Sequence, residues 1–257
     1  MFLAYLNLSF GAYFLSMVFY AAALFSKNRV FSLAARFFIT CAILALSIYI
    51  GMRWQIALRP PLSNMFESLV VFSWDIAVLL IFIDLKYKIK GINALTALMG
   101  LSTLGCASLL DKDIVPLLPA LKSNWLILHV LTCFIGYAAL TVAFVSSVII
   151  LCKKEKNANL DNISHKTIAF GFLFLTLGII SGSIWANSAW GTYWSWDPKE
   201  TWSLITWVIY AIYLHVRLRK RWRGQKAAWL SVVGFTAMLF TYFGVNYLLV
   251  GLHSYAQ

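Results

Sequence analysis

Charged residues are scarce in this sequence. Asp, Glu, Lys and Arg make up 12% of its 257 residues, whereas hydrophobic residues make up 61%. The mean hydropathy is +0.80. A soluble domain of this length would carry about twice this fraction of charge. The composition therefore excludes an ordinary soluble domain and predicts an integral membrane protein.

The sequence also lacks linkers and a removable leader. No Cys-rich, low-complexity or Gly/Pro-rich stretch divides it, so we predict a single polytopic membrane domain over residues 1–257. No basic residue precedes Lys27. The N-terminus thus lacks the positively charged region of a signal peptide, and its first apolar run is long enough to span a membrane.

Cysteine motifs are missing as well. None of the four cysteines forms a C-x-x-C pair, and no C-x-x-C-H motif for covalent haem attachment occurs. We interpret the cysteines as small apolar filler residues. The chain is therefore predicted to be neither a thiol oxidoreductase nor itself a c-type cytochrome.

Long hydrophobic runs dominate the sequence instead. A helix needs roughly 20 apolar residues to cross a bilayer. We therefore predict an all-α integral membrane protein with about eight transmembrane helices. The eight runs lie at about residues 5–25, 35–52, 66–85, 91–110, 125–152, 167–187, 201–216 and 227–252.

Basic residues predict the orientation. Of the 21 Lys and Arg residues, 16 lie in alternate loops, which leaves five on the opposite side. The positive-inside rule then places both termini on the non-cytoplasmic side, together with the loop between the sixth and seventh helices. The net charge of +12 follows from this topology and requires no nucleic-acid partner.

That external loop belongs to a tryptophan-rich segment, residues 185–207, which holds six of the 11 tryptophans. An interfacial belt explains two or three of them. Gly191 and Pro198 are expected to force a non-helical platform that suits a flat apolar ligand such as a porphyrin. Asp197 and Glu200 are expected to cap the helix that begins near Pro198.

Two histidines are predicted at the same depth as this segment. His129 lies just inside the fifth span and His253 at the external end of the eighth. Neutral imidazole is a natural axial ligand of haem iron. Each histidine alone could be an interfacial hydrogen-bonded residue, but their coincidence with the tryptophans favours a haem site.

His215 is predicted to lie deep in the seventh span. It follows Trp202 by 13 residues, which is about 20 Å along a helix. An ionisable side chain at that depth is a functional candidate; the alternative is an interface residue beside Arg217. His165 is expected to be solvated among polar residues. Gly178 and Gly182 form a small-xxx-small pair expected in helix packing.

Two carboxylates in the third run are ambiguous. Glu67 lies at the external edge, where a carboxylate at a helix start is ordinary. Asp75 lies nine residues into the span and is unfavourable there unless it is paired.

With these residues assembled, the chain resembles the CcsA (ResC) family, System II cytochrome c biogenesis proteins of the haem-handling WWD-domain superfamily. The resemblance rests on WANSAWGTYWSWDPKETWSLITW at 185–207, on PLSNMFESLVVFSW at 61–74, and on the positions of His129, His215 and His253. It implies that His129 and His253 are external axial ligands of haem iron. It further implies that His215 is a ligand at an intramembrane station, completed by a histidine of the partner subunit, CcsB (ResB). The residues implied to cover the haem are Trp190, Trp194, Trp196, Asp197 and Trp202.

The resemblance implies a function in two parts. The chain would accept haem in the membrane and present ferrous haem b at the external site, as a component of a cytochrome c haem lyase. There the C-x-x-C-H motif of apocytochrome c would receive it covalently. The expected location is a bacterial inner membrane or, alternatively, a thylakoid membrane. The alternatives in function are a System I haem-handling protein, a bis-histidine haem b electron-transfer subunit and a secondary transporter.

Overall fold

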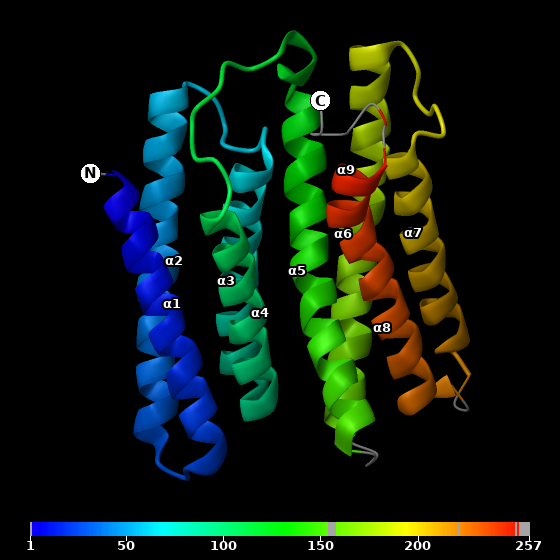
Figure 1. Ribbon diagram of the computed structural model, residues 1–257. Helices are drawn as coiled ribbons and strands as arrows, with labels where there is room; N and C mark the ends of the chain where they lie inside the picture. The colour runs from blue at the N-terminus through cyan, green and yellow to red at the C-terminus, as the bar shows by residue number, and fades with distance from the viewer. Residues whose placement is uncertain (1, 154–157, 220–221, 250, 252–257) are drawn as a thin grey trace. The chain divides into compact units, whose positions relative to one another are not determined.

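The computed structural model describes residues 2–153, 158–219, 222–249 and 251, and every regular element within them is helical (Figure 1). Seven helices in these ranges are long and apolar enough to cross a membrane. The prediction of an all-α, multi-pass membrane protein is thus confirmed. The predicted run at 201–216 forms helix α7 (Pro198–Val216) but is not among the seven, because Lys199, Glu200 and several Ser, Thr and Trp residues lower its hydropathy.

The helices divide into two compact units, Met1–Leu117 and Leu118–Gln257. The single domain and the external position of the termini, both predicted from the sequence, stay predictions.

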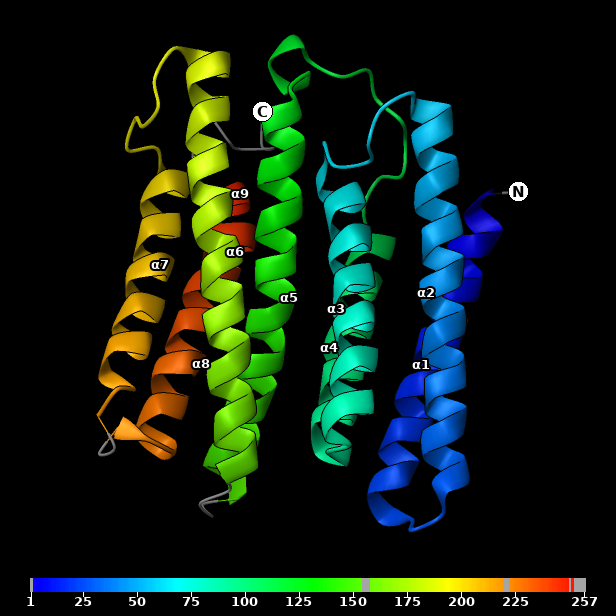
Figure 2. The same ribbon diagram turned by 180° about the vertical axis from the view of Figure 1, so that it is seen from behind.

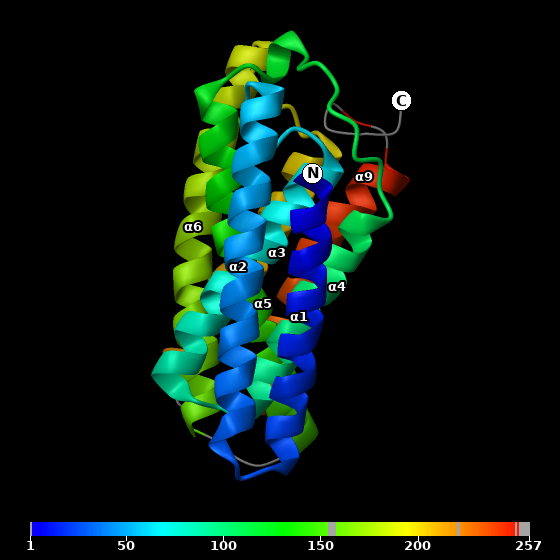
Figure 3. The ribbon, with the colours of Figure 1, turned by 90° about the vertical axis from the view of Figure 1, so that its left-hand side faces the viewer.

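The first unit contains four helices: α1 (Phe2–Phe25), α2 (Arg29–Ala57), α3 (Met65–Tyr87) and α4 (Lys90–Ser108). Within it α1 packs against α2 and α4, and α3 packs against α2 and α4 (Figure 3). Asparagine caps two of the helices: the side chains of Asn28 and Asn64 accept hydrogen bonds from Val30 N and Glu67 N. These caps satisfy amide groups that helix starts otherwise leave without partners.

A buried carboxylate at one end of this unit links its helices. Asp84 of α3 accepts hydrogen bonds from Tyr20 of α1 at 3.0 Å, Arg36 of α2 at 2.6 Å and Asn93 of α4 at 2.5 Å. Since a buried charge must be paired and hydrogen-bonded, these contacts fix how the four helices meet.

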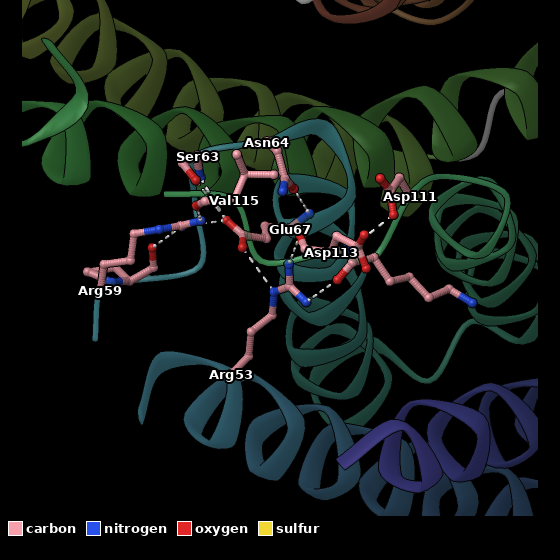
Figure 4. A network of polar contacts seen from close by, with 10 residues as sticks. Arg53, Arg59, Ser63, Asn64, Glu67, Asp111, Asp113 and Val115 are labelled. Atoms are coloured by element: carbon pink, nitrogen blue, oxygen red, sulfur yellow. Dashed lines mark hydrogen bonds and ion pairs between the residues drawn. The ribbon is translucent and has the colours of Figure 1, made fainter. Parts of the chain in front are cut away.

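A second buried carboxylate lies at the other end of the unit. Glu67, only 1% exposed, accepts a hydrogen bond from Arg53 at 2.9 Å on one oxygen and from Arg59 at 2.9 Å on the other (Figure 4). The second oxygen also accepts bonds from the amide and hydroxyl of Ser63. Glu67 thus lies in the first turn of a helix, as expected, and is also the centre of a buried ion-pair network.

The same two arginines hold the segment that follows α4. Arg53 donates to the carbonyl oxygens of Lys112 and Asp113 at 2.8 and 3.1 Å, and Arg59 donates to that of Val115 at 3.1 Å (Figure 4). Each guanidinium therefore connects Glu67 to the backbone of an otherwise irregular segment.

The second unit contains a short 3-10 turn, η1 (Pro119–Leu121), and the helices α5 (Asn124–Lys153), α6 (Ala158–Trp190), α7, α8 (Gln225–Leu239) and α9 (Val245–Leu248). Helices α5 and α6 run side by side (Figures 1 and 2). A Cβ added to Gly136 of α5 would lie 3.1 Å from the carbonyl oxygen of Gly171 in α6. Glycines thus let the two backbones approach, which is how membrane helices commonly associate.

Helix α8 continues into α9 through one π-helical turn, η3 (Phe240–Gly244). Such turns insert a residue into an α-helix and are frequent at functional sites. Here the turn packs against α7: Thr241 shares a 3.1 Å hydrogen bond with Thr206, and the rings of Phe240 and Trp202 lie 4.3 Å apart.

Candidate functional site

The start of α7 has the cap that its sequence predicts. The Asp197 side chain accepts a hydrogen bond from Lys199 N at 3.0 Å, Pro198 occupies the first turn, and Glu200 bonds back to Asp197 N. This capping box contributes about 1 kcal/mol to a helix start. The expected roles of Asp197 and Glu200 as capping residues are confirmed.

Glu200 also organises the loop before the helix. Gly191, with φ of +79°, ends α6, and residues 191–197 are non-helical, as expected. The carboxylate of Glu200 accepts a hydrogen bond from Ser195 N at 2.7 Å, and Thr201 donates to the carbonyl of Trp196 at 3.2 Å. These bonds hold Trp196 at a φ of +59°, which is uncommon for a bulky residue.

The tryptophans singled out from the sequence form separate groups. Trp194 and Trp196 meet edge to face at 5.8 Å, and Trp196 is 68% exposed. Trp202 lies on α7 against Phe240. Trp190 instead contacts the α6 residue Trp185, edge to face at 4.8 Å. The structure therefore presents an aromatic pair in the loop, of which Trp196 is exposed and Trp194 half-buried, and a second, more buried group at the end of α6.

His129 of α5 packs against two glycines of α6, Gly178 and Gly182. Its Nδ1 lies 2.7 Å from the carbonyl oxygen of Gly178 and 3.7 Å from Sγ of Cys133. A Cβ added to Gly182 would lie 2.5 Å from the same Nδ1. Because a carbonyl oxygen only accepts, Nδ1 carries the proton and Nε2 carries the lone pair. That tautomer is the one in which a histidine binds iron through Nε2.

Trp185 packs on the imidazole of His129. The two rings are nearly parallel, at 18°, with centroids 6.3 Å apart. Trp185 is 4% exposed, and its indole N–H donates to the carbonyl of Ala120 at 2.9 Å. The sequence placed Trp185 in the tryptophan segment but did not assign it to the site; its spacing from Gly178 and Gly182 on one helix is the signal that links it to His129.

Lys199 connects the start of α7 to this group. Its Nζ donates to Oδ1 of Asn246 in α9 at 2.8 Å, and Cys133, the neighbour of His129, lies nearby. Burial lowers the pKa of Lys199 to about 8, and the nearby Asp197 carboxylate acts in the opposite direction. Residues from α5, α6, α7 and α9 thus meet at one end of the second unit.

His253 lies outside the described residues. The chain is described as far as Gly251, two residues earlier, whose backbone lies against Asp197. A Cβ added to Gly251 would collide with Oδ2 of Asp197 and would lie 3.1 Å from Cδ of Pro198.

The opposite end of α7 carries the other histidine candidate. His215 lies in the last turn of α7 and is exposed, whereas Arg217 is buried and pairs with Asp161 of α6 at 2.6 Å. His165 is in helix α6 and is half-buried, with its ring 6.4 Å from that of Tyr213. The expectation that His165 is a solvated loop residue is therefore wrong: α6 begins at Ala158 and carries His165 against α7.

The position of Asp75 within the third span has no structural explanation. Its Oδ2 is buried and has no hydrogen-bond partner within the described ranges.

Three kinds of comparison place the chain among known proteins. A family model described as Cytochrome C assembly protein matches residues 62–253, which is 192 of the 257 residues. The chain is 39% identical to the cytochrome c biogenesis protein CcsA of Guillardia theta, over 83% of this chain and 82% of the relative. It is 38% identical to CcsA of Mesostigma viride, over 97% of this chain and 95% of the relative.

Among solved structures, Cytochrome c Heme Lyase CcmF matches with a TM-score of 0.77 at 17% identity. The match covers 95% of this chain and 46% of that chain, so this chain spans less than half of that protein's length. At this identity the likeness shows a shared fold.

Proposed function

Because the chain belongs to the CcsA family of cytochrome c biogenesis proteins, we propose that it is the haem-handling subunit of a System II cytochrome c synthase. It accepts haem in the membrane, holds ferrous haem b at an external site, and presents it to apocytochrome c. It does so as part of a cytochrome c haem lyase with a CcsB (ResB) partner subunit. Its membrane is the bacterial inner membrane or, alternatively, the thylakoid membrane.

The observation that carries this proposal is the setting of His129. Its Nδ1–H donates to the carbonyl of Gly178 at 2.7 Å, which fixes the ring and directs the lone pair to Nε2. A metal-binding histidine is usually held by a hydrogen bond of this kind from the ring nitrogen that does not bind the metal. His129 and His253 then serve as the two axial ligands of the external haem.

The tryptophan segment covers the haem in this proposal. Trp196 presents an exposed ring in the loop against half-buried Trp194, and buried Trp185 contacts half-buried Trp190 at the end of α6. Aromatic faces of this size suit a flat macrocycle and exclude water from it. Shielding of this kind, together with two imidazoles, helps keep the iron ferrous.

During attachment the haem must be held in place while one of its axial histidine ligands is exchanged. Each cysteine thiol of the C-x-x-C-H motif adds across a haem vinyl group, so that sulfur bonds to carbon and the thiol proton ends on the neighbouring carbon. The histidine of the motif displaces His129 or His253 from the iron. Loss of that ligand releases the product from this chain.

His215 belongs to the inner station. It is exposed on α7, at the far end from the tryptophan segment. The 19 residues of α7 separate these ends by about 28 Å. An outward-facing imidazole suits a ligand pair that is completed by a histidine of the partner subunit.

Ligand replacement tests the external site. His129→Ala and His253→Ala should each abolish cytochrome c maturation in cells that contain the partner, and added imidazole should restore part of it by filling the vacated coordination position. Purified protein should show the corresponding change in its haem absorption spectrum. Full maturation by either variant would remove that histidine from the mechanism, and a wild-type chain without a Soret band would exclude haem handling altogether.

A further inference from the structure

Helix α7 buries few of its residues. Thr206, Tyr210 and Tyr213 are the buried ones among its 19, whereas 17 of the 30 residues of α5 are buried. Sparse packing holds an element less firmly than dense packing does. The rotation of α7 about its own axis therefore depends more on polar contacts at its ends than that of α5.

An ion pair supplies such a contact at the end of α7 that carries His215. Arg217, which ends the helix, donates from Nη2 to Oδ2 of Asp161 in α6 at 2.6 Å and to the carbonyl oxygen of Asp161 at 3.2 Å. The side chains of Arg217 and Asp161 are 7% and 16% exposed. Nε and Nη1 of Arg217 have no hydrogen-bond partner among the described residues. Within these residues, Asp161 is thus what holds the guanidinium.

Asp161 is itself held in place by two further helices. It lies in the first turn of α6, where the helix dipole favours a carboxylate. Its other oxygen, Oδ1, accepts a hydrogen bond from the backbone N–H of Gly224, the residue before α8, at 3.1 Å. The starts of α6 and α8 and the end of α7 lie at the same end of the unit (Figures 1 and 2). One carboxylate therefore gives Arg217 a fixed partner.

The position of Arg217 determines which way His215 faces. Residues two apart on an α-helix are rotated by about 200° about its axis. The helix remains regular to its end, because the backbone N–H of Arg217 bonds to the carbonyl of Tyr213 at 3.1 Å. Since Asp161 holds Arg217 on the packed side, His215 lies on the opposite, exposed side. Rotation of this last turn would carry the imidazole toward the packed side.

We propose that Asp161 and Arg217 position His215 for haem ligation at the inner station. This inference rests on the proposed function, in which His215 forms a ligand pair with a histidine of the partner subunit. Two imidazoles from separate chains meet at one iron only if each is held in the right direction. Loss of the support of a metal-binding histidine lowers metal affinity about 10- to 100-fold. Asp161 and Arg217 accordingly act as positioning residues and do not need to touch the haem.

Haem binding at the inner station tests this role. The full chain, with its partner subunit, carries His129→Ala so that the external site does not contribute to the spectrum. Arg217→Leu and Asp161→Ala should each lower haem per mole of chain about 10-fold. Imidazole should restore it by supplying the ligand that His215 no longer provides. Arg217→Lys should bind more haem than Arg217→Leu, because an ammonium still pairs with Asp161. Arg223→Ala is the matched control, since it removes the same charge from an exposed residue.

Combined variants separate positioning from a general loss of stability. Arg217→Leu together with Asp161→Ala should bind as much haem as Arg217→Leu alone, because effects that pass through one contact do not add. With imidazole present, Arg217→Leu should bind as much haem as His215→Ala, since both then lack the same ligand. A chain that is merely destabilised would show additive losses and would not respond to imidazole.

Each result decides between these roles. Normal haem content in Arg217→Leu, or a loss that imidazole does not reverse, would overturn the positioning role. If Arg217→Leu does not assemble with the partner subunit, Asp161→Ala decides by the same criteria. Normal haem content in His215→Ala would instead overturn the ligand role in the proposed function. A non-additive loss that imidazole reverses would establish the inference.

Discussion

His129 shows how single residues prepare a candidate ligand. The imidazole needs a neighbour that accepts a hydrogen bond from Nδ1–H. It also needs a space that no side chain of the neighbouring helix occupies. Gly178 supplies the carbonyl at 2.7 Å, and Gly182 supplies the space. The small-xxx-small pair that the sequence assigned to helix packing therefore also accommodates a histidine.

Gly182→Ala tests this arrangement. Its Cβ would lie 2.5 Å from Nδ1 and 2.8 Å from Cε1 of His129, so the ring must move. Overpacking of this kind costs about 1–3 kcal/mol, and displacement of the ring should lower haem retention about 10-fold. Haem per mole of purified chain measures the effect. Gly11→Ala, with open space around it, should retain wild-type haem; equal haem in both variants would contradict the steric role.

The tryptophans of the segment at 185–207 should affect haem retention and not membrane insertion. Trp190→Ala, Trp194→Ala and Trp196→Ala, made singly, should each lower haem retention while the protein still inserts into the membrane, because the apolar spans are unchanged. Trp229→Ala is the control, since Trp229 is 60% exposed and Trp196 68%, and Trp229 lies in α8 outside the segment. Wild-type haem content in all three variants would show that the segment is only an interfacial anchor.

At the scale of elements, two irregular segments are held by carboxylates of nearby helices. Glu200 of α7 binds the backbone of the tryptophan loop. Glu67 of α3 binds two arginines, which in turn bind the backbone after α4. Both loops are thereby fixed by charge-assisted hydrogen bonds, which are roughly twice as strong as neutral ones.

Glu67→Gln should destabilise the first unit. The change keeps the shape but leaves Arg53 and Arg59 without a counter-charge, and breaking a buried ion pair costs about 3–5 kcal/mol. A fall in Tm of purified protein checks this. Asp111→Asn is the control, because Asp111 is exposed and accepts one bond from Asp113 N, which asparagine also does. Equal Tm values for the two variants would show that the network does not support the fold.

At the scale of the whole molecule, the basic residues favour the predicted orientation more strongly than their count suggests. Two of the five Lys and Arg residues on the predicted external side, Arg53 and Arg59, are buried partners of Glu67. A third, Lys199, donates to Asn246. These residues are present because the fold pairs them, so their positions do not weaken the bias that sets the topology.

The two-station proposal predicts an order of loading. With the partner subunit present, His215→Ala should leave the external site empty, because haem reaches that site through the inner station. His129→Ala and His253→Ala should still load the inner station, so their haem per mole of chain should exceed that of His215→Ala at matched expression. His165→Ala is the control at the same end of the unit. Normal external haem and normal maturation in His215→Ala would end the two-station proposal.

The sequence alone determined what depends on local chemistry. Long apolar runs fixed the membrane class and the approximate helix positions, although α6 begins nine residues before the predicted run at 167–187, because span length follows from bilayer thickness. The run D-P-K-E predicted the cap of α7, since capping involves residues within one turn. The tryptophan segment and the run at 61–74 indicated the family, which the relatives confirm.

Tertiary structure decided which faces meet. In a membrane both the packed and the lipid-exposed faces of a helix are apolar, so periodicity alone does not show that His165 packs against α7 while His215 points away. The arginine partners of Glu67 lie 14 and eight positions away in the sequence, and Arg53 also bonds to the backbone beyond α4. The contacts of His129 with α6 and of Gly251 with Asp197 likewise join segments 49 and 54 positions apart. Pairings of this kind arise only when the helices pack, because they depend on the approach of two backbones and not on any local preference.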